Sequence, residues 1–203
     1  MHNNSKSRPR TKPPEVRRDE LITAARSLFL RHGVGPTTIE QITSGADVAK
    51  GTFYLYFSSK DDILSALRER FAQTILTKIK TAIAKRREED WKGKLEAWAA
   101  AGTSGYLGAN RLHDVLFYAS HPRSRKGLVN NIVIDHLAEL LQAGAKAGAW
   151  TIEDARSTSV FLFSGLHGLV DAAHNHQNAV VRRVGLTRTL TRLCFRALGL
   201  APR

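Results

Sequence analysis

The sequence predicts an all-helical protein, and three features of the chain lead to this prediction. Apolar residues recur at helical spacing over long stretches, for example from Leu64 to Ile83. Ser, Thr and Asp residues that can cap a helix precede several of these stretches. No segment keeps the alternation of apolar and polar residues that a half-buried strand requires.

The composition of the chain indicates how large a core it can bury and what kind of partner its charge favours. The chain has 203 residues, of which 42% are hydrophobic, so it can bury a core and form one domain or two small ones. Its formal net charge of +13 and its pI near 10.4 favour a polyanionic partner, because phosphate contacts dominate DNA affinity. The positive charge is spread over the whole chain, however, and an ordinary basic protein is the alternative.

Residues 1–14 form a polar, proline-rich arm with basic residues and no acidic residue before position 15. We expect this basic arm to be disordered in isolation, because it lacks apolar residues that could fold it. Two roles are open for it. It could contact the DNA backbone or a minor groove, or it could be a solubilising tail.

The next residues predict two short helices joined by a tight turn, after a first helix over residues 15–32. Thr37 and Glu40 have the spacing of a capping box, which indicates that the second helix begins there. Asp47 follows at a turn that is expected to need a left-handed backbone. Residues 49–55 predict a third helix, too short to be stable alone. This order is typical of a helix-turn-helix unit that reads DNA.

The third predicted helix carries side chains suited to DNA. Lys50, Thr52 and Tyr54 supply ammonium and hydroxyl groups that can reach phosphates and base edges. Gly51 costs about 1 kcal/mol relative to Ala inside a helix, which favours a role in close approach. The alternative is an ordinary helical hairpin with a solvated lysine.

The runs TTIEQI and ADVAKGTFYLYFSSKDDIL, within residues 16–67, resemble the N-terminal domain of the TetR family of bacterial transcriptional regulators. The resemblance implies DNA contacts, mostly to phosphates, by Thr38, Lys50, Gly51, Thr52, Tyr54 and Lys60. Two positions depart from the family pattern: Asp47 stands where Gly is usual, and Ala49 stands where Ser or Thr is usual. Ala49 can neither cap a helix nor donate a hydroxyl to a phosphate.

A long fourth helix is predicted to begin after Ser58 or Ser59 and to reach Ile83. We expect a DNA-binding domain over residues 15–60 and a second helical domain over residues 61–203. In the TetR family the fourth helix joins these parts, so its tilt can carry a signal; a core helix without a switching role is the alternative. Further helices are expected over 91–107, 111–119, 126–147, 154–174 and 185–198, with a break at His121 and Pro122.

The segment 160–175 is apolar nearly all round, which an exposed helix of a monomer could not sustain. The resemblance implies that the last two long helices pair in a homodimer. The candidate interface residues are Ser164, Gly165, Gly168, Leu186, Leu190 and Leu193. A two-fold dimer presents two recognition helices and predicts a palindromic operator. The alternative is a fully buried helix of a monomer.

The resemblance also implies a small-molecule site between the helices of the second domain. The candidate lining residues are aromatic or polar: Trp98, Tyr106, Phe117, Tyr118, His136 and His167. Core packing is the alternative role for each of them. A ligand would act by favouring a conformer whose recognition helices are wrongly spaced for DNA.

Several other functions are not expected. The chain has neither a G-x-S-x-G motif nor a P-loop, so we do not expect an enzyme. No histidine stands in a spacing such as His-Glu-x-x-His, and we expect no metal and no cofactor. The single Cys194 cannot form an intramolecular disulfide. Without a signal peptide or a run of 18 apolar residues, a cytoplasmic protein with no membrane partner is expected.

Together these inferences predict a homodimeric, ligand-responsive repressor of TetR type, which binds double-stranded operator DNA and is released by a small-molecule effector. The alternative is a regulator of the same fold that acts as an activator or through a protein partner, without a small-molecule ligand.

Overall fold

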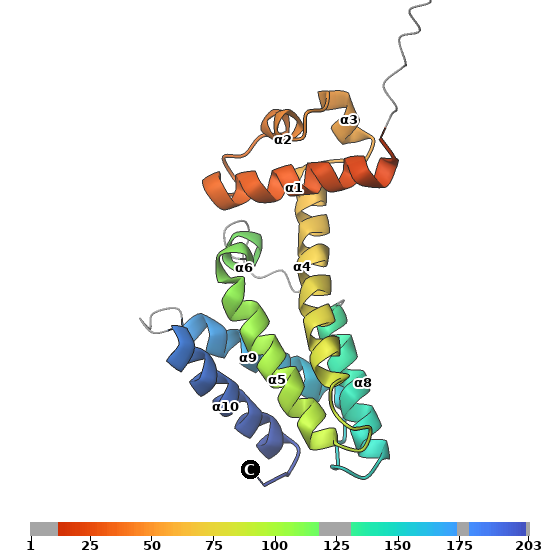
Figure 1. The fold of residues 1–203 in the computed structure, drawn as a ribbon, viewed down its shortest axis with the longest axis vertical. Coiled ribbons are helices and arrows are strands. Elements are labelled where there is room, and N and C mark those ends of the chain that lie inside the picture. Colours follow the sequence, from red (N-terminus) through yellow and green to blue (C-terminus); the bar gives the residue numbers. More distant parts are fainter. Residues whose placement is uncertain (1–11, 118–130, 174–178, 202–203) are drawn as a thin grey trace, which may run out of the picture. The chain divides into compact units, whose positions relative to one another are not determined.

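The computed structural model of the chain describes residues 12–117, 131–173 and 179–201. Within these ranges all regular structure is helical, as predicted, and the helices are shown in Figure 1: α1 (Pro14–His32), α2 (Ile39–Gly45), α3 (Lys50–Tyr54), α4 (Lys60–Ile83), α5 (Trp91–Gly108), α6 (Asn110–Phe117), α8 (Ile132–Lys146), α9 (Ala155–Ala172) and α10 (Ala179–Ala197). The chain packs as two compact units, Met1–Arg68 and Glu69–Arg203. The division falls inside α4, later than the boundary expected after residue 60.

The first unit is built around one small apolar core. Helix α1 contacts α2, and α2 contacts α3. The buried side chains come from α1, α2, α3, the segment between α3 and α4, and the start of α4: Leu21, Ile22, Ala25, Phe29, Ile42, Phe53, Phe57, Ile63 and Leu64. A helix as short as α3 is not stable by itself, so burial of Phe53 in this core holds it in place.

Helix α2 begins one residue later than the sequence indicated. The predicted capping box of Thr37 and Glu40 is wrong: Thr38 is the N-cap, its Oγ1 accepts from Gln41 N at 3.2 Å, and the Gln41 side chain accepts from Thr38 N. Thr37 is buried instead, and its hydroxyl donates to the Gly33 carbonyl at 2.7 Å. Because Glu40 has no capping role, its carboxylate can make another contact.

The turn and the start of α4 follow local rules. Asp47 has a φ of 51°, which confirms the left-handed backbone expected there. Ala49 is the N-cap of α3 and makes no side-chain capping hydrogen bond. At α4 the choice between two serines is decided for Ser59, whose Oγ accepts from Asp62 N at 3.2 Å. Asp62 in turn accepts from Ser58 N at 2.9 Å.

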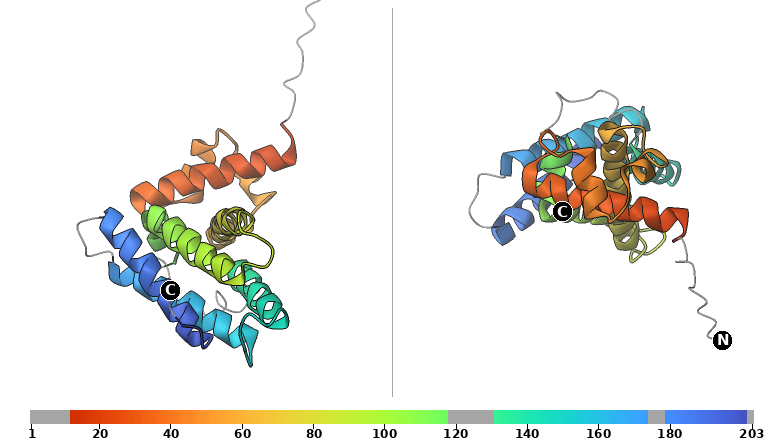
Figure 2. Two further views of the ribbon diagram at one scale, coloured as in Figure 1. Left: turned by 60° about the horizontal axis from the view of Figure 1, so that its bottom comes forward. Right: turned by 90° about the horizontal axis from the view of Figure 1, so that it is seen from above.

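In the second unit α5 contacts α6, α9 and α10, and α9 also packs against α8 and α10. Figure 1 and the left view of Figure 2 show α5 and α10 side by side. The largest buried side chains here include Trp98 of α5 and Phe195 of α10, and α4, α8 and α9 also contribute buried aliphatic residues. This core holds Trp98 and Tyr106, two of the aromatic residues that were predicted to line a ligand site.

Two predicted helix starts are wrong. Helix α8 begins at Ile132 and not at residue 126, because the Asn131 side chain caps it by accepting from Val133 N and Ile134 N. Helix α10 begins at Ala179 and not at Gly185, since a single glycine lowers helix stability without ending the helix. The arm over residues 1–11, the predicted break at His121 and Pro122, and the candidate Tyr118 lie outside the described residues.

Candidate functional site

The residues predicted to contact DNA lie on the exposed side of α2 and α3. Thr38, Lys50 and Gly51 are exposed, Thr52 is half-buried, and Tyr54 has an exposed fraction of 52%. The opposite side of α3 is anchored by Phe53, whose ring contacts Phe57 at a centroid distance of 5.6 Å. Helix α3 therefore rests on the core with one side and presents polar groups with the other.

Nothing inside the protein requires a glycine at position 51. A Cβ built on Gly51 would meet no atom within 4 Å. Its φ is not in the left-handed region either, so an alanine could adopt this backbone. A glycine that costs helix stability and has no internal reason indicates an external surface that comes close.

Lys50 is not isolated on this surface. Its ammonium forms an ion pair with the Glu40 carboxylate, and both side chains are more than half exposed, at 55% and 60%. The hydrogen bond between them raises the pKa of Lys50 and lowers the pKa of Glu40. The pair links the first turn of α2 to the first residue of α3. Sequence reasoning missed Glu40, because it had given this residue a capping role.

Lys60 is the first residue of α4, whereas the other residues predicted to contact DNA belong to α3 or to the N-cap of α2. Its Nζ donates to the carbonyl oxygens of Gly35 at 2.8 Å and Thr37 at 2.9 Å. These bonds tie the start of α4 to the loop that leads into α2, and they occupy two of the three ammonium protons. Lys60 therefore holds the loop that leads into the N-cap of α2, and a direct DNA contact by its remaining proton stays a prediction.

A groove next to α3 brings together residues that the sequence did not single out. It is lined by the start of α1 and by the turn and α3: Lys12, Pro13, Pro14, Arg17, Asp47, Val48, Ala49, Thr52, Leu55 and Tyr56. Lys12 and Arg17 both pair with Glu20, which lowers the pKa of that carboxyl through these hydrogen bonds. Leu55 is 79% exposed, which is unusual for a leucine and adds an apolar group beside the polar ones.

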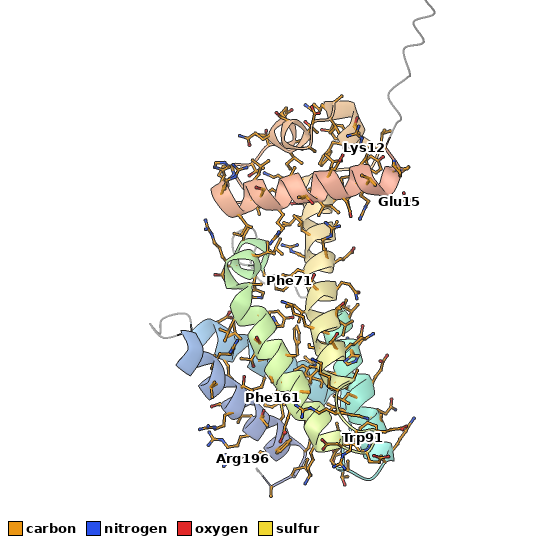
Figure 3. The ribbon with its side chains drawn as sticks, in the orientation of Figure 1. Lys12, Glu15, Phe71, Trp91, Phe161 and Arg196 are labelled. Carbon is orange, nitrogen blue, oxygen red and sulfur yellow. The ribbon has the colours of Figure 1, made fainter. Side chains whose placement is uncertain are left out.

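In the second unit, aromatic rings and imidazoles from four helices meet in one cluster. Its members are Phe71 of α4, Tyr106 of α5, His113 and Phe117 of α6, and Phe163 and His167 of α9. Neighbouring ring centroids lie between 4.3 Å and 6.2 Å apart. We call this set the ring cluster. It contains three of the predicted ligand-site residues, and Figure 3 labels Phe71 on α4.

The ring cluster combines apolar faces with hydrogen-bonding groups. Burial raises the pKa of Tyr106, so its hydroxyl stays protonated and can donate. Nδ1 of His167 lies 3.0 Å from the Phe163 carbonyl oxygen. The carbonyl can only accept, so in the neutral ring Nδ1 carries the proton and Nε2 is an acceptor.

Two other predicted ligand-site residues lie apart from these ring contacts. Trp98 is fully buried, and its Nε1 has no hydrogen-bond partner among the residues that the structure describes. His136 of α8 has a pKa lowered by burial and by the nearby charge of Lys80, and its buried Nδ1 has no partner there either. Buried polar atoms are usually paired, so these two groups are candidates to bind something polar.

The first compact unit matches a known family. The model for bacterial regulatory proteins of the tetR family matches residues 21–67, which hold α2, α3 and every predicted DNA contact. The N-terminal unit of the chain is thus a TetR-family domain of bacterial regulatory proteins. The match ends at Leu67, one residue before the end of the first compact unit.

Curated TetR relatives resemble this regulator over parts of their length. The repressor KstR2 of Rhodococcus jostii is 28% identical over 145 residues, which cover 66% of this chain and 68% of KstR2. The regulator YerO of Bacillus subtilis is 33% identical over 78 residues, which cover 38% of this chain but only 25% of YerO. The chain thus spans about a quarter of the length of YerO and two thirds of KstR2.

Solved structures share the fold over nearly the whole chain. The fatty acid degradation regulator FadR of Bacillus halodurans has a TM-score of 0.68 and 23% identity, covering 90% of this chain and 97% of FadR. RolR in complex with resorcinol has a TM-score of 0.57 and 22% identity, covering 96% and 97%. At such identities the likeness concerns the fold of this TetR-family member and not its ligand.

Helix α9 of this TetR-family chain presents an uncharged stripe to solvent. Ser157, Phe161, Ser164, Gly168 and Ala172 are exposed at successive turns, and the exposed fraction of Phe161 is 66%. Gly165 adjoins the stripe, and a Cβ on it or on Gly168 would meet nothing within 4 Å. We call these residues the α9 stripe. Figure 3 labels Phe161, the apolar member that sequence reasoning missed.

The leucines predicted for the interface divide between surface and core. Leu193 of α10 is 42% exposed and Leu186 is half-buried, whereas Leu190 is 1% exposed. Leu190 therefore packs inside its own subunit, and the expectation that it contacts a partner is corrected. The side chain of Val184, with an exposed fraction of 52%, adds an apolar group to α10.

The part of the chain that the structure describes was also compared with the requirements of a metal site and of a membrane-spanning helix. Over residues 12–117, 131–173 and 179–201, no group of three or more His, Cys, Asp or Glu side chains is placed to hold a metal ion. In the same ranges no helix combines the length and apolar character that crossing a membrane needs. His174 and His176 fall outside these ranges.

Proposed function

We propose that this TetR-family chain is a homodimeric transcriptional repressor that binds a palindromic DNA operator and is released by a small-molecule effector. The observation that carries the proposal is the exposed side of α2 and α3, where Thr38, Lys50 and Tyr54 are exposed together with Gly51, a glycine with no internal role. A relative of the same family, KstR2, is named a repressor, which supports this mode of action.

The proposed DNA contacts combine charge, hydroxyl groups and close approach. Lys50 supplies a cation to a phosphate, and Thr38, Thr52 and Tyr54 supply hydroxyl groups to phosphates or base edges. Gly51 lets the duplex approach the backbone of α3. Lys60 also acts indirectly, because it holds the loop that sets the position of Thr38. The groove residues Lys12 and Arg17 extend the positive charge beside α3.

The proposed dimer uses the α9 stripe together with the exposed leucines of α10. A stripe with two glycines and two serines allows another helix to approach closely, and Phe161 supplies apolar area that water otherwise covers. A two-fold axis through this surface would pair each stripe with its copy, as an isologous interface requires. Two recognition helices then face one duplex, so the operator is palindromic.

The proposed effector site is the ring cluster. Its faces suit a flat, mostly apolar molecule, and Tyr106 and His167 suit one or two hydroxyl groups on it. RolR binds resorcinol, a molecule of this kind, within the same fold. Entry of such a molecule would displace Phe71, which lies on the continuous helix α4. Shifting α4 would favour a conformer unable to bind the operator.

A specific observation also favours the alternative, a regulator that acts as an activator or through a protein partner without a small-molecule ligand. The rings of the cluster contact one another at 4.3 to 6.2 Å, as they would in an ordinary core. A core of this kind needs no ligand to complete it. The two possibilities differ in whether any small molecule changes operator affinity.

The experiment that tests the proposal begins with selection of duplexes from a random DNA pool by the purified protein. An inverted repeat with half-sites about one helical turn apart is the expected product. The selected duplex then serves as the probe for aromatic alcohols and fatty acids, scored by release of the protein. Salt-sensitive binding without an enriched sequence would contradict the proposal. Operator binding that no small molecule alters would favour the alternative.

A further inference from the structure

One acidic side chain lies among the proposed DNA contacts. Glu40 is in the first turn of α2, two residues after the N-cap Thr38, and its carboxylate holds the ammonium of Lys50. Figure 1 shows α2 and α3, the helices that this ion pair joins. Both side chains are mostly exposed, so the pair is not needed to complete the core. An acid at such a place repels phosphates and weakens binding to a duplex that offers it no hydrogen-bond donor.

We propose that Glu40 is a specificity-determining residue, which restrains Lys50 on unselected DNA and releases it where an operator base donates a hydrogen bond to the Glu40 carboxylate. This inference rests on the proposed DNA-binding function. It assigns to Glu40 a role that neither capping nor the family resemblance gave it.

Glu40 affects two kinds of duplex differently. On unselected DNA, Lys50 can reach a phosphate only by leaving Glu40, and the unpaired carboxylate then faces a polyanion. On the operator, an exocyclic amino group in the major groove replaces Lys50 as the donor, and Lys50 is free to bind a phosphate. Cytosine N4 is the amino group that carboxylates accept from most often. Repulsion against the wrong duplex and attraction to the right one both contribute to specificity.

The test compares Glu40→Gln with the full-length wild type on the selected operator and on a scrambled duplex, over a series of salt concentrations. Removing the charge frees Lys50, so affinity for scrambled DNA should rise about three- to tenfold at low salt, with a salt dependence steeper by about one unit of log–log slope. The ratio of operator to scrambled affinity should fall by the same factor or more. Glu89→Gln, in the exposed loop of the other unit, removes an equal charge and should leave the ratio unchanged.

A second variant tests whether Glu40 acts through Lys50. In a Lys50→Gln background, Glu40→Gln should raise the affinity for scrambled DNA by much less than it does in the wild type. An equal rise in both backgrounds would overturn the role of the ion pair. An unchanged affinity ratio for Glu40→Gln, with normal operator selection by the wild type, would overturn the inference alone. Failure of the wild type to select any sequence would overturn the inference and the proposed function together.

Discussion

Ala49 is one of the two residues at which this chain departs from the TetR-family pattern. It is the N-cap of α3, with an extended backbone that suits a capping side chain, yet it supplies no hydrogen bond. The free N–H groups at the start of α3 therefore lack a side-chain acceptor. A capping side chain at this single position is therefore expected to increase the stability of the protein.

Ala49→Ser is expected to stabilise the protein by about 1 kcal/mol, because a serine hydroxyl can accept from the first N–H groups of α3. The hydroxyl is also expected to strengthen operator binding by donating to a phosphate. Urea unfolding and operator titration measure the two effects. Ala49→Val adds bulk without a hydroxyl, and an equal gain from this control would contradict the capping explanation.

Gly51→Ala separates stability from DNA binding. The added methyl group meets no atom of the protein, so the free energy of unfolding should stay equal or rise by up to about 1 kcal/mol. Operator affinity should nevertheless fall, because the methyl group occupies the surface that the duplex approaches. Thermal unfolding and DNA titration of the same sample provide the measurement. Undiminished operator affinity would mean that DNA does not come close to this residue.

At the scale of elements, helix ends and helix contacts decide the fold of the second unit. Helix α8 starts at its asparagine cap and is held near its end by Trp150, which is buried and donates from Nε1 to the Leu141 carbonyl at 2.9 Å. The Trp150 ring lies against Gly144, where a Cβ would be only 2.1 Å from Cζ2. Gly144 is thus a packing glycine, unlike Gly51.

Gly144→Ala should therefore destabilise the protein by about 1 to 3 kcal/mol, since overpacking against a rigid ring outweighs the higher helix propensity of alanine. The matched control is Gly108→Ala at the end of α5, where a Cβ meets nothing within 4 Å and stability should be kept. Urea unfolding followed by tryptophan fluorescence distinguishes them. If both substitutions had the same effect, the close contact with Trp150 would not be the cause.

At the scale of the whole molecule, the proposed dimer is what would bring two recognition helices to one duplex. The α9 stripe is an uncharged surface that does not contribute to the core of its own subunit, since its glycines face open space and Phe161 faces water. A surface of this kind is costly in a monomer and useful in a dimer.

Gly168→Arg and Phe161→Asp are each expected to give monomers that lose operator affinity, because they place charges at the centre of the proposed interface. Sedimentation reports the assembly, and DNA titration reports the function. Thr81→Arg, on the exposed surface of α4, should leave both unchanged. An intact dimer in both α9 variants would show that the subunits meet elsewhere.

The sequence alone determined the helical fold class, the turn at Asp47 and the exposure of Lys50 and Tyr54 on α3. These features depend on residues close together in the chain: apolar spacing, a left-handed turn residue and a short helix anchored by one phenylalanine. The interactions that produce these features join residues that are close in the sequence, so a sequence pattern is enough to predict them. Most of the proposed DNA contacts belong to this class.

Only the tertiary structure decided the rest of the candidate site. Lys60 binds carbonyls 25 and 23 positions away, and the ring cluster draws its members from four helices. Glu40, which does not take part in the α2 cap, pairs with Lys50 of α3. The burial of Leu190 depended likewise on which side of α10 meets the core. Each of these outcomes is a contact between separate parts of the chain, and residue spacing within one segment carries no information about the partner that folding brings to it.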